Sequence, residues 1–459
     1  MSLGHVFSVS RMVLLSAAAA YASIALAHGQ DAVTYSKDVA PILYQHCVIC
    51  HHANDIAPMS LMNYKEVRPW ARAIREKVVQ RVMPPWYGDP QSHEFSNDPR
   101  LSEAEIAIIQ EWVENGAPEG NPGDLPPAPA LTVGWHMQPD VVFSIPEHLV
   151  PAGQQDDYEV IFVPTNFRED RWFQATEVSP GDRRVVHHVN VNVLSAEDAD
   201  RQQRFAKPGH KTNAFRFVTG TVSHTKLDAP VVDDGCSSPD GGALPGSPAG
   251  DWTVQPGIYL PGHMPEVQPP GYAIKIPKGS YLMFDIHYNN RLLEDVKDRT
   301  SIGLIAEKEQ LNGEVGLLDI ENEMFLIPPD ASDHKVTACY TLDRDVLAIA
   351  MTAHMHFRGK SMKTEAFYPD GHSEVLLNVP KYDFRWQQTY VLKKQSFLQK
   401  GTRLFVTAYF DNSVNNPLNP DHTRTIRWGE PSDEEMMAFW LQYAEPANRT
   451  GVKFNGPKQ

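Results

Sequence analysis

Cysteine, positive charge and long apolar runs are all scarce in this sequence, and each shortage excludes a class of protein. Only 4 of the 459 residues are cysteine, too few for a fold held together by disulfide bonds. The 57 Asp and Glu residues outnumber the 41 Lys and Arg residues, which gives a net charge of −16 and argues against nucleic acid as a partner. Beyond residue 27, no apolar stretch approaches the roughly 20 residues that a membrane-spanning helix needs.

The one long apolar run lies at the N-terminus and has the form of a secretory signal. Arg11 precedes it, Met12 to Ala27 is rich in Ala and Leu, and Ala25-Leu26-Ala27 places small residues at a cleavage position. An uncleaved membrane anchor is the alternative, but the run is short for a span. We therefore expect residues 1–27 to be a signal peptide that is removed, and the protein to be periplasmic or secreted.

Residues 28–116 have the apolar periodicity of helices. Ser102 and Glu105 form a capping box ahead of one helix, and apolar side chains recur at helical spacing between residues 64 and 82. Five prolines then fall within residues 117–130, which is typical of a stiff linker. The sequence therefore predicts a small all-α domain followed by a proline-rich linker.

After the linker, short alternating segments lie between turn residues, which is the pattern of an all-β fold. Lys278-Gly279-Ser280-x-Leu282 recurs 122 residues later as Lys400-Gly401-Thr402-x-Leu404. A common turn-and-strand pattern would explain one such match. Two related β-sandwich domains, at residues 131–310 and 311–447, would also explain the internal repeat, and we favour them. Residues 448–459 are expected to form a tail.

Cys47-Val48-Ile49-Cys50-His51 has the Cys-x-x-Cys-His spacing of a c-type haem attachment site. Two thiols three positions apart can each add to a haem vinyl group, and the adjacent imidazole can ligate the iron. A dithiol redox pair and half of a zinc site are the alternatives. No second cysteine pair is present to complete a zinc site, so the haem interpretation is preferred.

The second axial ligand of this haem is expected downstream, with Met59, Met62 and Met83 as candidates. Met83 begins a Met-Pro-Pro-Trp segment that ends at Trp86. This stretch resembles the single-haem cytochrome c domains of bacterial exported multidomain proteins, in which such a segment carries the axial Met. The resemblance implies one covalent haem c held by Cys47, Cys50, His51 and Met83.

Histidine and methionine gather in the β region, and their imidazole and thioether groups suit copper better than Mg²⁺ or Ca²⁺. His354 and His356 are two positions apart, so on a strand both would face the same side. His187 and His188 are adjacent and would face opposite sides unless a bulge or a strand end turns one of them.

The order of His-His, a single His, His-x-His and then Met resembles the copper type II, ascorbate-dependent monooxygenases over about residues 150–445. In that family the His pair and the single His hold an electron-transfer copper, and His-x-His with Met holds the oxygen-activating copper. Met436 is preferred to Met437 because it directly follows an acidic run. The implied ligands are His187, His188 and His287 for the first copper and the catalytic set His354, His356 and Met436 for the second.

This resemblance implies hydroxylation of an aliphatic C–H bond of a small-molecule substrate by O₂. Peptide-amidating members have an Arg where this chain has Thr352 and a Tyr where it has Trp440, so glycine-extended peptides are not expected as substrates. Electrons are expected from an external donor, either a small redox protein or an ascorbate-like reductant, through a haem docked near His187 and His188.

The complete expectation is a multidomain protein with a small all-α cytochrome c domain followed by two all-β, jelly-roll-like sandwich copper domains. The alternative is a non-catalytic periplasmic electron-transfer or copper-binding protein with the same ligands. Cys236 and Cys339 could form a disulfide bond after export, and the sequence leaves that pairing open.

Overall fold

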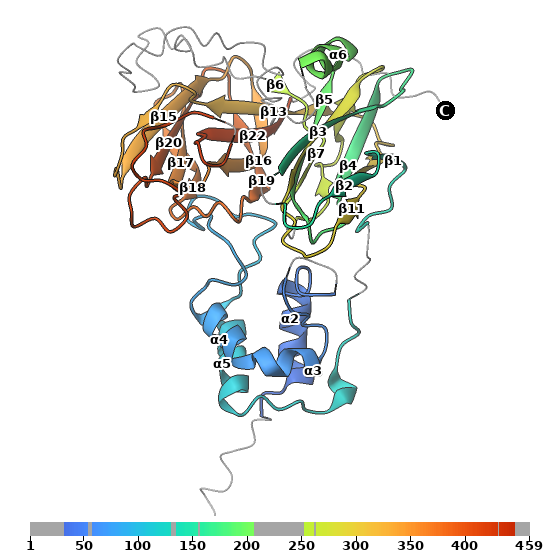
Figure 1. Ribbon diagram of the computed structural model, residues 1–459, viewed down its shortest axis with the longest axis vertical. Helices are drawn as coiled ribbons and strands as arrows, with labels where there is room; N and C mark the ends of the chain where they lie inside the picture. Colours follow the sequence, from blue (N-terminus) through green and yellow to red (C-terminus); the bar gives the residue numbers. More distant parts are fainter. Residues whose placement is uncertain are drawn as a thin grey trace, which may run out of the picture.

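The computed structural model shows a small helical region joined to a larger region of β-sheets (Figure 1). The described residues are 32–53, 57–129, 135–154, 157–205, 252–260, 263–429 and 431–445. The predicted signal peptide, the predicted tail and Cys236 lie outside them. Among the residues that are described, no helix is long and apolar enough to cross a membrane.

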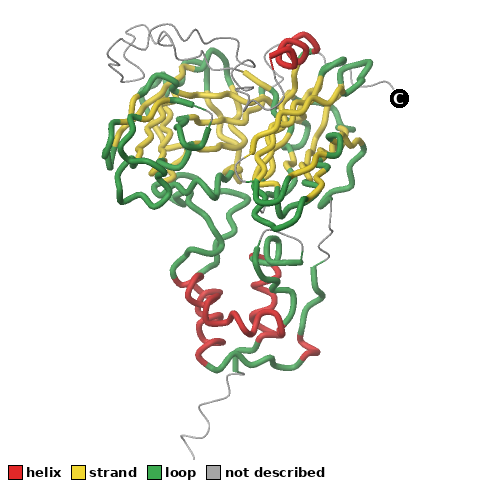
Figure 2. The backbone as a smooth tube through the Cα atoms, viewed as in Figure 1, coloured by secondary structure: helices red, strands yellow, loops and turns green. Residues whose placement is uncertain are grey.

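Every regular element of the helical region, residues 35–124, is a helix (Figure 2). Ser102 accepts the backbone N–H of Glu105, whose side chain accepts the N–H of Ser102, so the predicted capping box is confirmed. The periodic stretch between residues 64 and 82 is three short helices and ends at residue 79. The helices are η1 (Tyr35–Val39), α2 (Ala40–His46), α3 (Tyr64–Val67), η2 (Arg68–Trp70), α4 (Ala71–Val79), α5 (Glu103–Glu114) and η3 (Pro122–Asp124).

The β region is built on one large sheet with a smaller four-stranded sheet packed on each half of it. In order across the large sheet lie β1 (Val141–Ser144), β12 (Ser301–Ala306), β4 (Arg171–Ser179), β9 (Tyr272–Ile276), β13 (Gly313–Glu321), β22 (Ala438–Ala444), β16 (Val346–His354) and β19 (Thr389–Leu398). Beside β13 and β4 lie β6 (Trp252–Thr253) and β8 (Glu266–Val267), respectively.

The smaller sheets define the two sandwiches. The first sandwich has β3 (Asp157–Pro164), β10 (Tyr281–Tyr288), β5 (Val186–Leu194) and β7 (Gly257–Tyr259). The second has β15 (His334–Thr341), β20 (Arg403–Phe410), β17 (Gly359–Phe367) and β18 (Ser373–Val379). Two short pairs and one helix complete the region: β2 (His148–Val150) with β11 (Val296–Asp298), β14 (Leu326–Ile327) with β21 (Ile426–Arg427), and α6 (Ala196–Phe205).

The two sandwiches are joined through backbone pairing. β9 of the first half pairs in parallel with β13 of the second, with Tyr272 opposite Gly313, so the large sheet is continuous across both halves. The predicted β-rich fold is confirmed, and one sheet runs through both sandwiches. The domain boundary at residue 311 stays a prediction. Alternating patterns identify strands without showing which strands pair, so the sequence could not reveal this join.

The internal repeat occupies equivalent places in the two sandwiches. β10 and β20 each lie inside their four-stranded sheet, and each follows a glycine with positive φ, 69° at Gly279 and 88° at Gly401. After each strand a fully buried asparagine joins the strand end to a segment far away in the sequence. The Asn290 Nδ2 donates to Val150 O, and the Asn412 Nδ2 donates to Pro328 O. Corresponding residues of the repeat therefore have the same structural role in both halves.

Cys339 lies on β15 and is disulfide-bonded. Neither Cys47 nor Cys50 is disulfide-bonded. The pairing of Cys339 with Cys236 stays a prediction, because Cys236 is not among the described residues.

Candidate metal centre

Three predicted copper ligands meet on the first sandwich. His187 and His188 come from β5 and His287 comes from β10. One candidate ligand nitrogen of each ring lies within 4.8 Å of those of the other two. The His187 and His188 ring centroids are each 4.9 Å from that of His287. These three residues, the three-His cluster, could therefore share one metal ion.

A β-bulge brings the adjacent histidines to the same site. Along β5 and β10, His188 lies opposite His287, but Val186 rather than His187 lies opposite Tyr288. His187 is thus the extra residue of the bulge, and its side chain is released from strict alternation. The structure therefore has the bulge that His187 and His188 need in order to bind the same metal ion.

A second pair of predicted ligands lies on the second sandwich. His354 is the last residue of β16, and His356 lies in the loop that follows, so the expected shared strand face is replaced by a strand end. Their ring centroids are 5.2 Å apart. His354 lies opposite Ala438 on β22, and Met436 comes two residues before Ala438. Met437 belongs to the apolar core, which leaves Met436 as the thioether at this strand end.

Hydrogen bonds orient the two rings of this pair for metal binding. The Nδ1 of His354 is 2.6 Å from Gln387 Oε1, and the Nδ1 of His356 is 3.3 Å from Glu434 O. Because both partners are acceptors, each Nδ1 carries the proton and each Nε2 carries the lone pair. In metal-ligating histidines, the ring nitrogen that does not bind the metal typically donates such a hydrogen bond. The donor set therefore fits copper.

Burial keeps the imidazoles in the form that binds metals. It lowers the pKa of His354 to about 4 and places the pKa values of His188 and His356 well below the usual range. These rings are neutral at pH 7, and a neutral imidazole offers a lone pair without first losing a proton.

Glu435 fixes the loop that carries His356, and sequence reasoning did not assign it a role. Its buried carboxylate accepts the N–H of His356 at 2.8 Å and the N–H of Arg358 at 2.6 Å. Burial raises the pKa of Glu435 to about 8, against the lowering effect of these donors. Since Glu435 precedes Met436, one residue links the His356 loop to the thioether strand. Its place in an acidic run was the only signal.

Aromatic side chains connect the two sites across the junction of the sandwiches. The Phe384 ring centroid is 6.5 Å from that of His187 and 5.9 Å from that of His356. Tyr158 stacks on His287, with centroids 4.3 Å apart, and its hydroxyl is 2.8 Å from Ser432 Oγ. Phe384 therefore packs against one ring of each site, and the two sites lie close to one another at the junction of the sandwiches.

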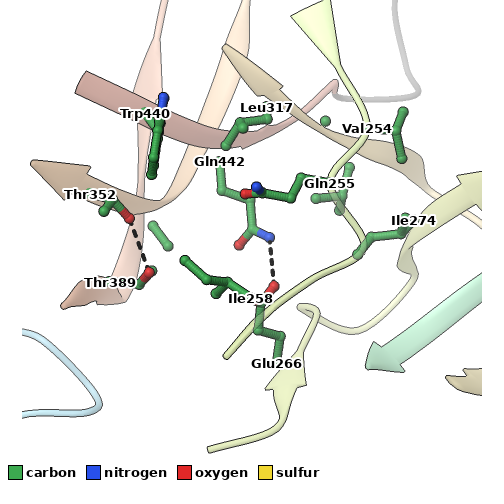
Figure 3. A pocket seen from close by; sticks show the side chains of 13 residues that line it. Val254, Gln255, Ile258, Glu266, Ile274, Leu317, Thr352, Thr389, Trp440 and Gln442 are labelled. Carbon is green, nitrogen blue, oxygen red and sulfur yellow. Dashed lines mark hydrogen bonds between the residues drawn. The ribbon is translucent and has the colours of Figure 1, made fainter. Parts of the chain in front are cut away.

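A small cavity of about 30 Å³, room for about one water molecule, is lined by Thr352, Trp440 and Gln442 (Figure 3). Trp440 stacks on His354 with centroids 4.9 Å apart. Thr352 and Thr389 join their hydroxyls at 3.0 Å on one side, and Gln442 donates to Glu266 on the other. The wall thus contains hydroxyl, amide, carboxylate and indole groups.

The Cys-x-x-Cys-His motif forms a tight turn at the end of α2. The N–H of His51 donates to Cys47 O at 3.0 Å, and His51 Nδ1 is 3.2 Å from Met59 O. The latter contact places the proton on Nδ1 and the lone pair on Nε2, as an iron ligand requires. Burial raises the pKa of Cys47 to about 12, so it is a thiol. The residues present fit a covalent haem.

The two candidate axial methionines lie in different surroundings. Met59 packs partly buried against the helical core, which Cys47 also contacts. Met83 follows α4 and begins the segment that leads to the second sandwich. The choice of Met83 as the axial ligand stays a prediction.

The three-His cluster and the His354–His356 pair both lie on a β-sandwich scaffold. Residues 313–458 match the family model described as "Copper type II ascorbate-dependent monooxygenase, C-terminal domain". The matched part of the chain contains His354, His356 and Met436. The family is one of copper-dependent monooxygenases, so the enzyme class is oxidoreductase.

No curated protein matches the chain. Two solved structures show only remote likeness. The VP2 subviral particle of infectious bursal disease virus has 6% identity and a TM-score of 0.19, covering 70% of this chain and 76% of that one. A Paenibacillus xanthan lyase has 8% identity and a TM-score of 0.15, covering 71% and 28%. At these scores neither likeness carries an argument.

Proposed function

We propose that the protein is an exported monooxygenase that uses two coppers and one covalent haem c to hydroxylate an aliphatic C–H bond of a small molecule. The overall reaction converts R–H, O₂, two electrons and two protons into R–OH and water. The observation that supports this proposal is that Phe384 packs against both His187 of the three-His cluster and His356 of the second pair. When bound, copper supplies one-electron redox chemistry and O₂ activation, and haem stores an electron from an external donor.

The two ligand sets differ in chemistry and suit different roles. His187, His188 and His287 supply only imidazoles, which suit an electron-transfer copper. His354 and His356 are joined by the thioether of Met436, which favours Cu(I) and is the set expected where O₂ reacts. Because Nδ1 of each ring is bonded to Gln387 or Glu434, Nε2 is the nitrogen with which each histidine would hold a metal.

The surroundings of His354 select the kind of substrate. Trp440 presents an indole face, and Thr352 presents a hydroxyl that is already bonded to Thr389. No cation is supplied at position 352 to offset the cost of burying a carboxylate. We therefore infer an uncharged or weakly polar substrate.

Metal content and isotope incorporation test this function. The protein, produced with its signal peptide in cells that mature c-type cytochromes, should hold one covalent haem and two coppers. With ascorbate and ¹⁸O₂, a panel of small aliphatic and arylalkyl compounds should give at least one ¹⁸O-labelled alcohol. Met436→Ile should abolish that product and leave the haem reducible, because a hydrocarbon cannot replace the thioether as a Cu(I) ligand. Full metal content with no labelled product across the panel would favour the electron-transfer alternative.

A further inference from the structure

The helical region is fastened to the second sandwich by the crossing segment, residues 83–97. The N–H of Ser96 donates to Val391 O at 2.8 Å, and the N–H of Lys393 donates to Glu94 O at 2.9 Å, so the segment extends the edge of β19. Trp86 is buried against Tyr390 of the same strand, with ring centroids 4.9 Å apart. The proline-rich linker is therefore not the connection that positions the helices on this face.

A cavity of about 550 Å³ lies at this junction. On one side it is lined by Val48 and Ile49, the two residues between the cysteines of the haem motif. On the other side it is lined by Gln387 and Gln388. The haem-attachment turn thus faces the residues that adjoin His354, and not the three-His cluster near which we expected it to dock.

A continuous chain of bonds links the crossing segment to a copper ligand. Pro85 is joined through Pro84 to Met83, the proposed axial ligand of the haem. The carbonyl oxygen of Pro85 accepts a hydrogen bond of 2.7 Å from Gln388 Nε2. Gln388 is covalently bonded to Gln387, whose Oε1 accepts from His354 Nδ1 at 2.6 Å. Two short hydrogen bonds and the intervening covalent bonds complete the path.

We infer that Pro85, Gln388, Gln387 and His354 form a route by which an electron passes from the haem directly to the His354–His356–Met436 site. This inference rests on the haem and the coppers of the proposed function. Each transfer oxidises ferrous haem by one electron and reduces Cu(II) to Cu(I) at that site. The external donor then reduces the haem again, and two such transfers per turnover supply the two electrons of the reaction. The three-His copper is then not an obligatory relay for every electron.

Gln388→Leu tests the route without touching a copper ligand. It keeps the side-chain volume and removes the donor to Pro85 O. The measurement is anaerobic stopped-flow oxidation of ferrous haem by Cu(II) in the full-length His287→Ala background, in which copper remains only at the second site. Gln388→Leu should slow this oxidation several-fold, while the Cu(II) electron paramagnetic resonance spectrum stays unchanged.

Asn378→Leu is the matched control. Asn378 also donates a side-chain amide hydrogen bond to the crossing segment, at 2.9 Å to Asp89 Oδ2, but it does not lead to His354. The control should oxidise its haem at the parent rate. Equal rates for Gln388→Leu and Asn378→Leu would overturn the route. So would a haem that copper at the second site cannot oxidise after His287→Ala.

Failure of the proposed function would be seen separately. Haem staining after denaturation and copper analysis precede the kinetics, and a protein without covalent haem or without copper fails at that stage. A protein with full metal content and no effect of Gln388→Leu refutes only the route.

Discussion

At the scale of single residues, the site depends on groups that hold the ligands as much as on the ligands. Each ring of the His354 and His356 pair has an oxygen acceptor on Nδ1, and the loop between them is fastened by Glu435. The ligand types could be predicted because the order and spacing of His and Met residues can be read directly from the sequence. Gln387 and Glu435 act through contacts between residues 33 and 79 positions apart, which spacing alone does not reveal.

Gln387→Ala should weaken copper binding at the second site. Without the acceptor on Nδ1, the His354 ring loses its fixed orientation, and loss of such a partner typically costs about 10–100-fold in metal affinity. A competitive Cu(I) titration of the full-length protein measures this. Copper at the three-His cluster should be retained, and equal loss at both sites would contradict the role given to Gln387.

Glu435→Ala should lower the free energy of unfolding by about 2–5 kcal/mol, because two buried N–H groups, on His356 and Arg358, lose their acceptor. Denaturant unfolding of the apoprotein measures the change. Glu435→Gln keeps one amide oxygen and should lose less. The prediction fails if Glu435→Ala and Glu435→Gln both lower the free energy of unfolding only slightly, because the side chain of Glu435 would then not be holding the loop.

At the scale of elements, turns and bulges shape the site. The bulge at His187 could be predicted as a condition for metal sharing, since adjacent residues on a regular strand point apart. The end of β16 at His354 could not be predicted, because the alternation of apolar and polar residues does not show where the pairing with β22 stops. The repeat was visible because both copies need the same turn before the same strand.

Gly279→Ala should destabilise the first sandwich by about 1–2 kcal/mol, because its φ of 69° is unfavourable for a residue with a Cβ. Nothing lies within 4 Å of the added atom, so the cost is one of backbone conformation alone. Gly279→Asn should cost less, since Asn tolerates this region better. Thermal or denaturant unfolding distinguishes the variants, and an Asn variant as unstable as the Ala variant would point to another cause.

At the scale of the whole molecule, the arrangement of three parts brings the Cys-x-x-Cys-His motif, the three-His cluster, the His354–His356 pair and the crossing segment together. The parts and their order could be predicted from composition, prolines and motifs. Their docking could not, because Trp86 and Phe95 pattern as members of the helical region yet are buried with Tyr390 in the core of the second sandwich. Contacts between residues about 300 positions apart leave no local pattern.

Met83, the predicted axial ligand of a haem, begins the crossing segment, whereas Met59 packs against the helical core. Met83→Ala should change the reduced haem spectrum and lower the reduction potential, since a Met ligand raises it. Met59→Ala is the matched variant and should leave both unchanged. The reverse result would assign Met59 as the ligand and remove Met83 from the start of the electron route.

Trp86 should decide whether the helical region and the second sandwich unfold as one unit. Its indole packs against Phe95 and Tyr390 and is only 8% exposed, so Trp86→Ala leaves a cavity and should weaken the junction by about 3–5 kcal/mol. Because the remaining contacts of the crossing segment are mostly edge hydrogen bonds, we expect calorimetry to show a separate, earlier transition for the helical region.

Trp70→Ala is the control, since Trp70 is 43% exposed and belongs to the helical region alone. Limited proteolysis should then cut Trp86→Ala within residues 83–97 and spare the Trp70→Ala protein there. A single cooperative transition in both variants would show that Trp86 does not fasten the two parts.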